Sequence, residues 1–179
     1  DSLKISNSDF IKVDTQGYNY EVLQGSQGIL KNTLGVETEA EFTQIYQCQK
    51  LFGHISEILN KNNFDFIDFL TLKRWNRNNL DNYGQCTFGN ALFLKKPEYV
   101  FNLSKDKIIK YIAICTLYNK FDLIDHILES KKFNKTEKLR IKENLKFFKR
   151  YSNTSRNINK VASFINRSVD YESEIIIFQ

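Results

Sequence analysis

The sequence of 179 residues contains no methionine, one proline and seven glycines. The absence of methionine even at the first position is expected of a piece of a longer polypeptide, with a processed N-terminus as the alternative. Three cysteines, Cys48, Cys86 and Cys115, are odd in number and far apart, which indicates neither a zinc site nor a disulfide framework. We therefore expect incidental thiols in a reducing compartment and a cytoplasmic location.

No apolar run approaches the roughly 18 residues that a membrane-spanning helix needs. Positive charge is concentrated near the C-terminus, where residues 131–167 hold twelve lysines and arginines against two glutamates. The order of the expected strands and helices divides the chain in a similar way. We expect an α/β domain at 1–98, a basic helical appendage at 99–170, and the start of a further element or tail at 171–179.

What is present is a strand–helix–strand pattern near the N-terminus. Phe10–Val13 is short and apolar apart from Lys12, as expected of a buried parallel strand. A helix then groups four apolar side chains near one face: Tyr18, Val22, Ile29 and Leu30. The next strand, Leu34–Phe42, alternates strictly and carries three glutamates on one side: Glu37, Glu39 and Glu41.

Polar side chains gather where these two strands end. Lys12 and Asp14 flank Val13 and therefore point to the same face. Because ligands of open α/β sheets bind beyond the carboxyl ends of strands, we expect a site here, with a cleft beside Glu37 and Glu39. A Lys12–Asp14 pair would orient a bound molecule or take a proton from it, or else only shape the strand end as an ion pair. Paired carboxylates also suit a divalent cation, but a solvated acidic face gives the same pattern, and we expect no metal.

The remaining segments complete the α/β domain and begin the appendage. Strands are expected at Phe64–Leu72 and Cys86–Lys95, joined by a polar excursion in which Trp75, with Arg77 beside it, either stacks on a sugar or anchors the loop. The predicted helices of the appendage begin with caps at Ser104 and Thr136. A further helix is expected at Asn157–Ile165 and a strand at Glu174–Gln179.

This order of elements resembles the last strands of a class I S-adenosylmethionine-dependent methyltransferase, and more closely the FkbM family. The motifs that carry the resemblance are Lys12-Val13-Asp14-Thr15-Gln16-Gly17, Val22-Leu23-Gln24-Gly25-Ser26, Glu39-Ala40-Glu41-Phe42, the segment Tyr46–Phe52 with Gln49, Gly84-Gln85 and Gly89-Asn90-Ala91-Leu92-Phe93. They span about Phe10 to Pro97. The chain departs from the family pattern at Asn19, where the family usually has glutamate, and at Asn90, where it often has aspartate.

The resemblance implies an incomplete Rossmann-like sheet and methyl transfer from S-adenosylmethionine to a hydroxyl of a carbohydrate or natural product. It implies catalytic roles for Lys12, Asp14 and Glu39. It further implies cofactor contacts from Asp14, Gln16 and Gly17, and acceptor contacts from Tyr46, Gln49, Trp75 and Arg77. No glycine-rich turn of the kind that cradles the cofactor precedes Asp9, so we expect the intact parent to be the enzyme and this piece alone to be inactive. The alternative is a non-catalytic α/β module whose basic helices bind RNA or an anionic membrane surface.

Overall fold

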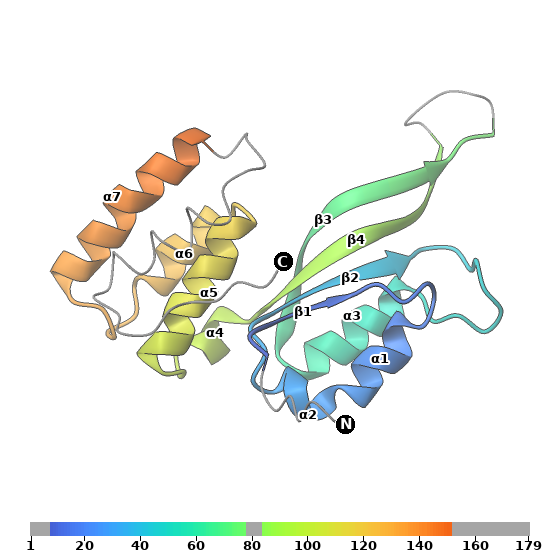
Figure 1. Cartoon of the computed structure of the whole chain (residues 1–179), viewed down its shortest axis with the longest axis horizontal. Coiled ribbons are helices and arrows are strands. Elements are labelled where there is room, and N and C mark those ends of the chain that lie inside the picture. Colours follow the sequence, from blue (N-terminus) through green and yellow to red (C-terminus); the bar gives the residue numbers. More distant parts are fainter. Residues whose placement is uncertain (1–7, 78–83, 152–179) are drawn as a thin grey trace. The chain divides into compact units, whose positions relative to one another are not determined.

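The computed structural model describes residues 8–77 and 84–151. The chain divides into two compact units, Asp1–Lys96 and Pro97–Gln179. The elements of the first unit are β1 (Phe10–Val13), α1 (Asn19–Gly25), α2 (Gln27–Leu30), β2 (Gly35–Glu41), α3 (Phe52–Lys61), β3 (Phe64–Trp75) and β4 (Gln85–Lys95) (Figure 1). The predicted helix at Asn157–Ile165 and strand at Glu174–Gln179 lie outside the described residues.

The first unit is built on a four-stranded mixed sheet in the order β1-β2-β4-β3. β1 and β2 are parallel and are connected by α1 and α2, whereas β4 runs antiparallel to both of its neighbours. The prediction of an α/β fold is thus confirmed. β1, however, is an edge strand among the described residues and is mostly half-buried, so its expected burial on both faces is wrong for this chain.

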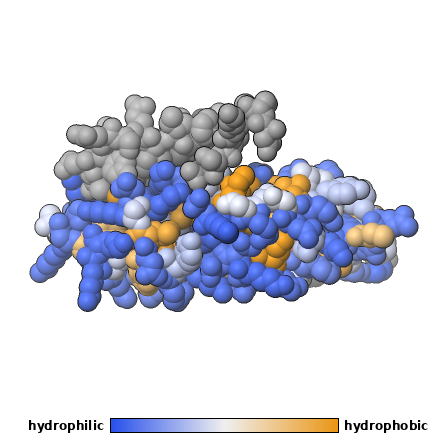
Figure 2. Space-filling view, turned by 90° about the horizontal axis from the view of Figure 1, so that it is seen from below, coloured by the Kyte–Doolittle hydropathy of each residue, from blue (hydrophilic) through white to orange (hydrophobic). Residues whose placement is uncertain are grey.

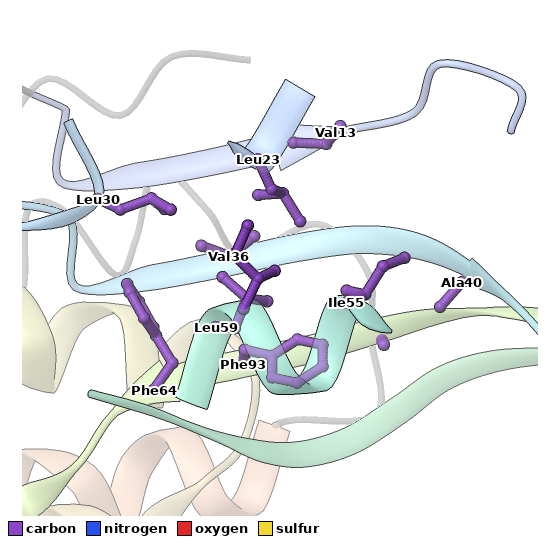
Figure 3. Close-up of a cluster of buried hydrophobic side chains, with 11 residues drawn as sticks. Val13, Leu23, Leu30, Val36, Ala40, Ile55, Leu59, Phe64 and Phe93 are labelled. Atoms are coloured by element: carbon purple, nitrogen blue, oxygen red, sulfur yellow. The ribbon is translucent and has the colours of Figure 1, made fainter. Parts of the chain in front are cut away.

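The apolar face of the sheet is covered by α1, α2 and α3 (Figure 3). The alternation along β2 explains this arrangement, because its even-numbered residues face the helices while the glutamates face the other way. The predicted inner face of α3 is also seen, with Ile55, Ile58 and Leu59 buried. Together these elements form one core: Val13, Leu23, Leu30, Val36, Ala40, Ile55, Ile58, Leu59, Phe64, Ala91 and Phe93.

The helix after β1 differs from the prediction in both continuity and orientation. It breaks at Ser26 into α1 and α2. Tyr18 is 69% exposed and Val22 is 38% exposed, whereas Asn19 and Leu23 are buried. The physical reason is a hydrogen bond from Asn19 Nδ2 to the Glu39 carbonyl oxygen at 3.0 Å, which turns this face of α1 toward β2.

The second unit is helical, with α4 (Pro97–Val100), α5 (Lys105–Leu117), α6 (Phe121–Ile127) and α7 (Lys135–Tyr151). The predicted cap at Ser104 is confirmed, since its Oγ accepts a hydrogen bond from the Lys107 amide. The predicted cap of α7 at Thr136 is wrong. Asn134 Oδ1 accepts from the Glu137 amide at 2.9 Å while Glu137 Oε2 accepts from the Asn134 amide at 3.0 Å, a reciprocal capping box.

The surface seen in Figure 2 is mostly hydrophilic, with apolar side chains reaching it in separate places. Within residues 8–77 and 84–151, no helix has both the length and the apolar character needed to cross a membrane.

Candidate functional site

Three carboxylates lie at the carboxyl ends of the parallel strands β1 and β2. Asp14 follows β1 directly, and Glu39 and Glu41 stand on the same face of β2. Burial raises the pKa of Glu39, and the charge of Asp14 raises it further. Burial also raises the pKa of Glu41, to which the charges of Glu39 and, more weakly, Asp14 add. We call Asp14, Glu39 and Glu41 the carboxylate cluster.

The cluster has members of unequal accessibility. Glu41 is only 2% exposed, whereas Glu39 is partly exposed. Among the described residues, no ion pair joins any of the three to a lysine or arginine. Mutual repulsion and burial therefore both favour protonation or a cationic or hydrogen-bonding ligand at this end of the sheet.

Lys12 forms an ion pair with Glu37, whereas the sequence analysis predicts a pair with Asp14. Its Nζ lies 2.9 Å from Glu37 Oε1, because the parallel register sets Lys12 directly opposite Glu37. The hydrogen bond and charge of Glu37 raise the pKa of Lys12, and Asp14 makes the weakest contribution. The expected proximity of Lys12 and Asp14 is thus real, but their ion pair is replaced by one across the strands.

The turn after β1 uses two positive-φ residues, Gln16 and Gly17. Gln16 Nε2 donates to Asp14 Oδ1 at 3.2 Å, which places both residues at the start of the site. At Gly17, where φ is +95°, an added Cβ would lie 2.5 Å from the Tyr46 ring. Glycine is therefore required here both by the backbone conformation and by the close approach of the loop that follows β2.

That loop brings Tyr46 and Gln49 close to Gly17, and the acceptor contacts that the resemblance implies for them stay a prediction. Gln49 Oε1 accepts hydrogen bonds from the Ile45 and Tyr46 amides, which folds the loop back on itself. The Gln49 amide also offsets part of the rise in the Glu41 pKa. Its Nε2 is buried and has hydrogen-bond geometry with none of the described residues.

Asn19 is a site residue that the sequence analysis noted only as a departure from the family pattern. It is 1% exposed. Its Oδ1 accepts from the amide and the hydroxyl of Thr15, both at 2.9 Å, and its Nδ2 donates to the Glu39 carbonyl oxygen. Asn19 therefore joins the turn after β1 to β2 and fixes the spacing between Asp14 and Glu39. The sequence offers no local signal for this role, because the contact of Asn19 with Glu39 joins residues twenty positions apart.

Trp75 and Arg77 lie elsewhere. β2 ends opposite Phe88 of β4, whereas β3 continues along β4 until Trp75 pairs with Gln85. The Arg77 guanidinium stacks 4.5 Å from the Trp75 ring centroid and donates to Gln85 Oε1. The predicted acceptor-binding residues thus form two groups, with Tyr46 and Gln49 beside the carboxylate cluster and Trp75 and Arg77 at the end of the β3–β4 hairpin.

The part of the chain that the structure describes contains no group of three or more His, Cys, Asp or Glu side chains arranged to hold a metal ion.

Residues 1–66 match the family model described as the Methyltransferase FkbM domain. Neither the curated proteins nor the solved structures contain a significant match. The predicted FkbM resemblance is confirmed over residues 1–66, a segment that includes the carboxylate cluster, while the motifs at Gly84 and Gly89 lie beyond the matched segment.

Proposed function

We propose that residues 1–96 form the acceptor side of a class I, Rossmann-like methyltransferase that uses S-adenosylmethionine. In the complete protein, the acceptor would be a hydroxyl of a carbohydrate or natural product. The observation that carries this proposal is the carboxylate cluster at the ends of β1 and β2, within the segment that matches the FkbM domain. The sheet supports it, because a parallel pair followed by an antiparallel hairpin agrees with the expected last strands.

The chemistry of O-methylation accounts for the cluster. A hydroxyl acceptor must be positioned and must lose its proton, and a base is most effective when its pKa approaches the working pH. Glu39 has a raised pKa and partial exposure, so it is our candidate base. Asp14 contributes the second charge, and Lys12 lies beside this end of the sheet in an ion pair with Glu37. Tyr46 and Gln49 would line the acceptor side.

The described residues fit only part of a cofactor site. Asp14, Gln16 and Gly17 offer a carboxylate and an open backbone turn. A glycine-rich turn that leads from a strand into a helix, which would cradle the nucleotide, does not occur ahead of β1 in the described residues. We expect this chain alone to be inactive.

The test is methyl transfer from labelled S-adenosylmethionine by the complete gene product, against a panel of hydroxylated acceptors. Glu39→Gln should reduce transfer at least a hundredfold, which lies within the range that general acid–base catalysis contributes. Asp65→Asn is the matched control, because Asp65 is a half-exposed carboxylate on β3 outside the cluster. No transfer by the complete product, or equal activity of both variants, would refute the proposal.

Calorimetry on the 179-residue chain tests the cofactor part separately. We expect no measurable S-adenosylmethionine binding, since the nucleotide cradle is not among the described elements. Micromolar binding would contradict our description of the chain as the acceptor side only.

A second candidate function belongs to the helical unit. The segment that begins at Lys131 and includes α7 exposes a series of cations: Lys131, Lys132, Lys135, Arg140, Lys142 and Lys146. Such a surface suits RNA or an anionic membrane. This alternative would be supported if the logarithm of the binding constant falls linearly with the logarithm of the salt concentration. Loss of biological activity upon Asp14→Asn in the complete protein would argue against it as the main function.

A further inference from the structure

A row of polar side chains crosses the sheet at the level of the carboxylate cluster. The register pairs Glu39 of β2 with Asn90 of β4, and it pairs Asn90 in turn with Thr71 of β3. Asp14 continues the row just after β1, because it follows Val13, which pairs with the residue before Glu39. Directly paired residues of neighbouring strands point to the same side of a sheet, so these polar groups are neighbours on one face.

This face is opposite to the one that α1, α2 and α3 cover. Ala40 and Ala91, which adjoin Glu39 and Asn90 along the strands, belong to the core beneath these helices (Figure 3). Because successive residues of a strand point to opposite sides, Glu39 and Asn90 share the other face. Directly opposed residues have Cβ atoms about 4.5–5.5 Å apart. One small molecule can therefore contact both side chains at once.

The Glu39 and Asn90 side chains are partly exposed and keep unused hydrogen-bonding capacity. Their hydrogen bonds use the main chain, since the Glu39 carbonyl oxygen accepts from Asn19 and the Asn90 amide N–H donates to the Thr71 hydroxyl. Within residues 8–77 and 84–151, neither the Glu39 carboxylate nor the Asn90 carboxamide makes a hydrogen bond or an ion pair. Both groups are thus available to a ligand.

The adjoining positions on this face define what else a ligand would meet. Toward the start of β2, Glu37 is 8% exposed and holds Lys12. Toward its end, Glu41 is 2% exposed. Phe88, which is paired with Glu41, is partly exposed and makes no aromatic contact with the described residues. The accessible groups next to Glu39 are therefore a carboxamide and an aromatic ring.

The hydrogen-bonding character of this pair favours a ligand with two neighbouring hydroxyls. An ionised carboxylate only accepts hydrogen bonds, whereas a carboxamide both donates and accepts. A single hydroxyl that donates to Glu39 would leave the Asn90 carboxamide without a partner, which costs free energy when the ligand displaces water. A second hydroxyl on the adjacent carbon supplies that partner. An anionic ligand group is disfavoured, because the carboxylate cluster repels it.

We propose that Glu39 and Asn90 together hold a vicinal diol of the acceptor, with the hydroxyl that is methylated on Glu39 and its neighbour on Asn90. The Phe88 ring packs against the carbons that carry the diol, as aromatic side chains do with the apolar side of a ring. This inference rests on the proposed function. It identifies Asn90 as the residue that selects the acceptor and decides which of two adjacent hydroxyls reacts.

NMR of the 179-residue chain tests the contact without any transfer. The probe is cis-1,2-cyclohexanediol, and cis-1,4-cyclohexanediol is its control because the same two hydroxyls are then on carbons that are not adjacent. We expect the 1,2-diol to shift the side-chain amide signals of Asn90, assigned by triple-resonance experiments, and the 1,4-diol to leave them in place. Equal shifts with both diols, or no shift with the 1,2-diol, would overturn the proposal.

Kinetics of the complete gene product test the consequence for transfer. An acceptor that the product methylates is compared with its deoxy analogue, which lacks the neighbouring hydroxyl. We expect kcat/KM to fall about tenfold for the deoxy analogue, and equally for Asn90→Ala with the full acceptor, as for the loss of one hydrogen bond. Asn90→Ala should not lower kcat/KM for the deoxy analogue further, because that contact is already absent. Equal losses on both acceptors would mean that Asn90 acts only through the fold, and would refute the proposal.

Asn60→Ala is the matched control, because Asn60 is an exposed asparagine on α3, which covers the other face of the sheet. It should bind the 1,2-diol and transfer methyl groups like the parent. Circular dichroism confirms that each variant is folded, and if Asn90→Ala is not, the two diols in the parent chain carry the test. A shifted Asn90 signal without transfer by the complete product would refute the proposed function and support the diol site. Transfer with equal kcat/KM for an acceptor and its deoxy analogue would refute the diol site alone.

Discussion

The buried lysine at the end of β4 allows the packing of the first unit to be tested quantitatively. Lys95 is 1% exposed, and its Nζ donates to the Asn62 carbonyl oxygen at 2.6 Å and lies 4.0 Å from the Phe64 ring centroid. Burial lowers the pKa of Lys95 from 10.5 to about 8. This shift corresponds to about 3 kcal/mol of unfavourable free energy for the charged form in the folded state.

The sign of the pH dependence follows from this depressed pKa. Between pH 8 and 10.5 the unfolded chain keeps a proton on Lys95 that the folded chain has lost. The unfolded state binds more protons in that window, so the free energy of unfolding rises with pH there. Below pH 8 both states are protonated, and the folded chain carries the full cost of the buried charge.

Lys95→Met removes that cost and the hydrogen bond to Asn62, which contributes about 1 kcal/mol. We expect the variant to be more stable than the parent by about 2 kcal/mol at pH 7, and this gain to vanish or reverse near pH 10.5. Urea unfolding under reducing conditions, followed by the fluorescence of Trp75 in the first unit, measures the difference at each pH.

Lys96→Met is the neighbouring control. Lys96 lies 3.7 Å from Asp65, and both side chains are partly exposed. Loss of such an ion pair should change the stability by less than about 1 kcal/mol. A stability difference between Lys95→Met and the parent that does not vary from pH 7 to 10.5 would refute our account of a buried charge.

Three further changes test the candidate site. Asn19→Ala should destabilise the chain by about 2–3 kcal/mol in urea unfolding, because three hydrogen bonds are lost, and a loss below about 1 kcal/mol would contradict its bridging role. Gly17→Ala should lower the free energy of unfolding by about 1–2 kcal/mol because of the positive φ at this position. Adding Tyr46→Ala should relieve only the steric clash, so complete recovery of stability in the double variant would disprove the backbone strain. Glu41→Gln should raise the stability at neutral pH. The raised pKa of Glu41 means that the folded chain loses stability as the pH rises above 4.5. A pH profile of unfolding that the substitution leaves unchanged would contradict this.

The sequence allowed the strands of the site to be predicted because strand periodicity is a local property. Phe10–Val13 was predicted with the bounds that β1 has, and the alternation of glutamates in β2 was predicted correctly. Register is not local. Pairing of the parallel strands places Lys12 opposite Glu37, and nothing in the spacing of Lys12 and Asp14 could reveal that partner.

The two helix errors have different causes. The orientation of α1 depends on the hydrogen bond from Asn19 to the carbonyl oxygen of Glu39, twenty residues away, so a tertiary contact overrides the apolar pattern of Tyr18 and Val22. The cap of α7 was predictable in principle. Asn134 is followed three residues later by a glutamate, which is the sequence pattern of a capping box.

Our central claim is that Asp14, Glu39 and Glu41 form one charge-coupled site, and NMR titration of glutamate side-chain carboxyls in the 179-residue chain tests it most directly. We predict that Glu39 and Glu41 titrate above the ordinary value of 4.5, and that Asp14→Asn lowers the pKa of Glu39 more than that of Glu41. Glu57, whose pKa is lowered by Lys61, is the internal control and should not respond. Ordinary titration of Glu39 and Glu41, unaffected by Asp14→Asn, would contradict the claim.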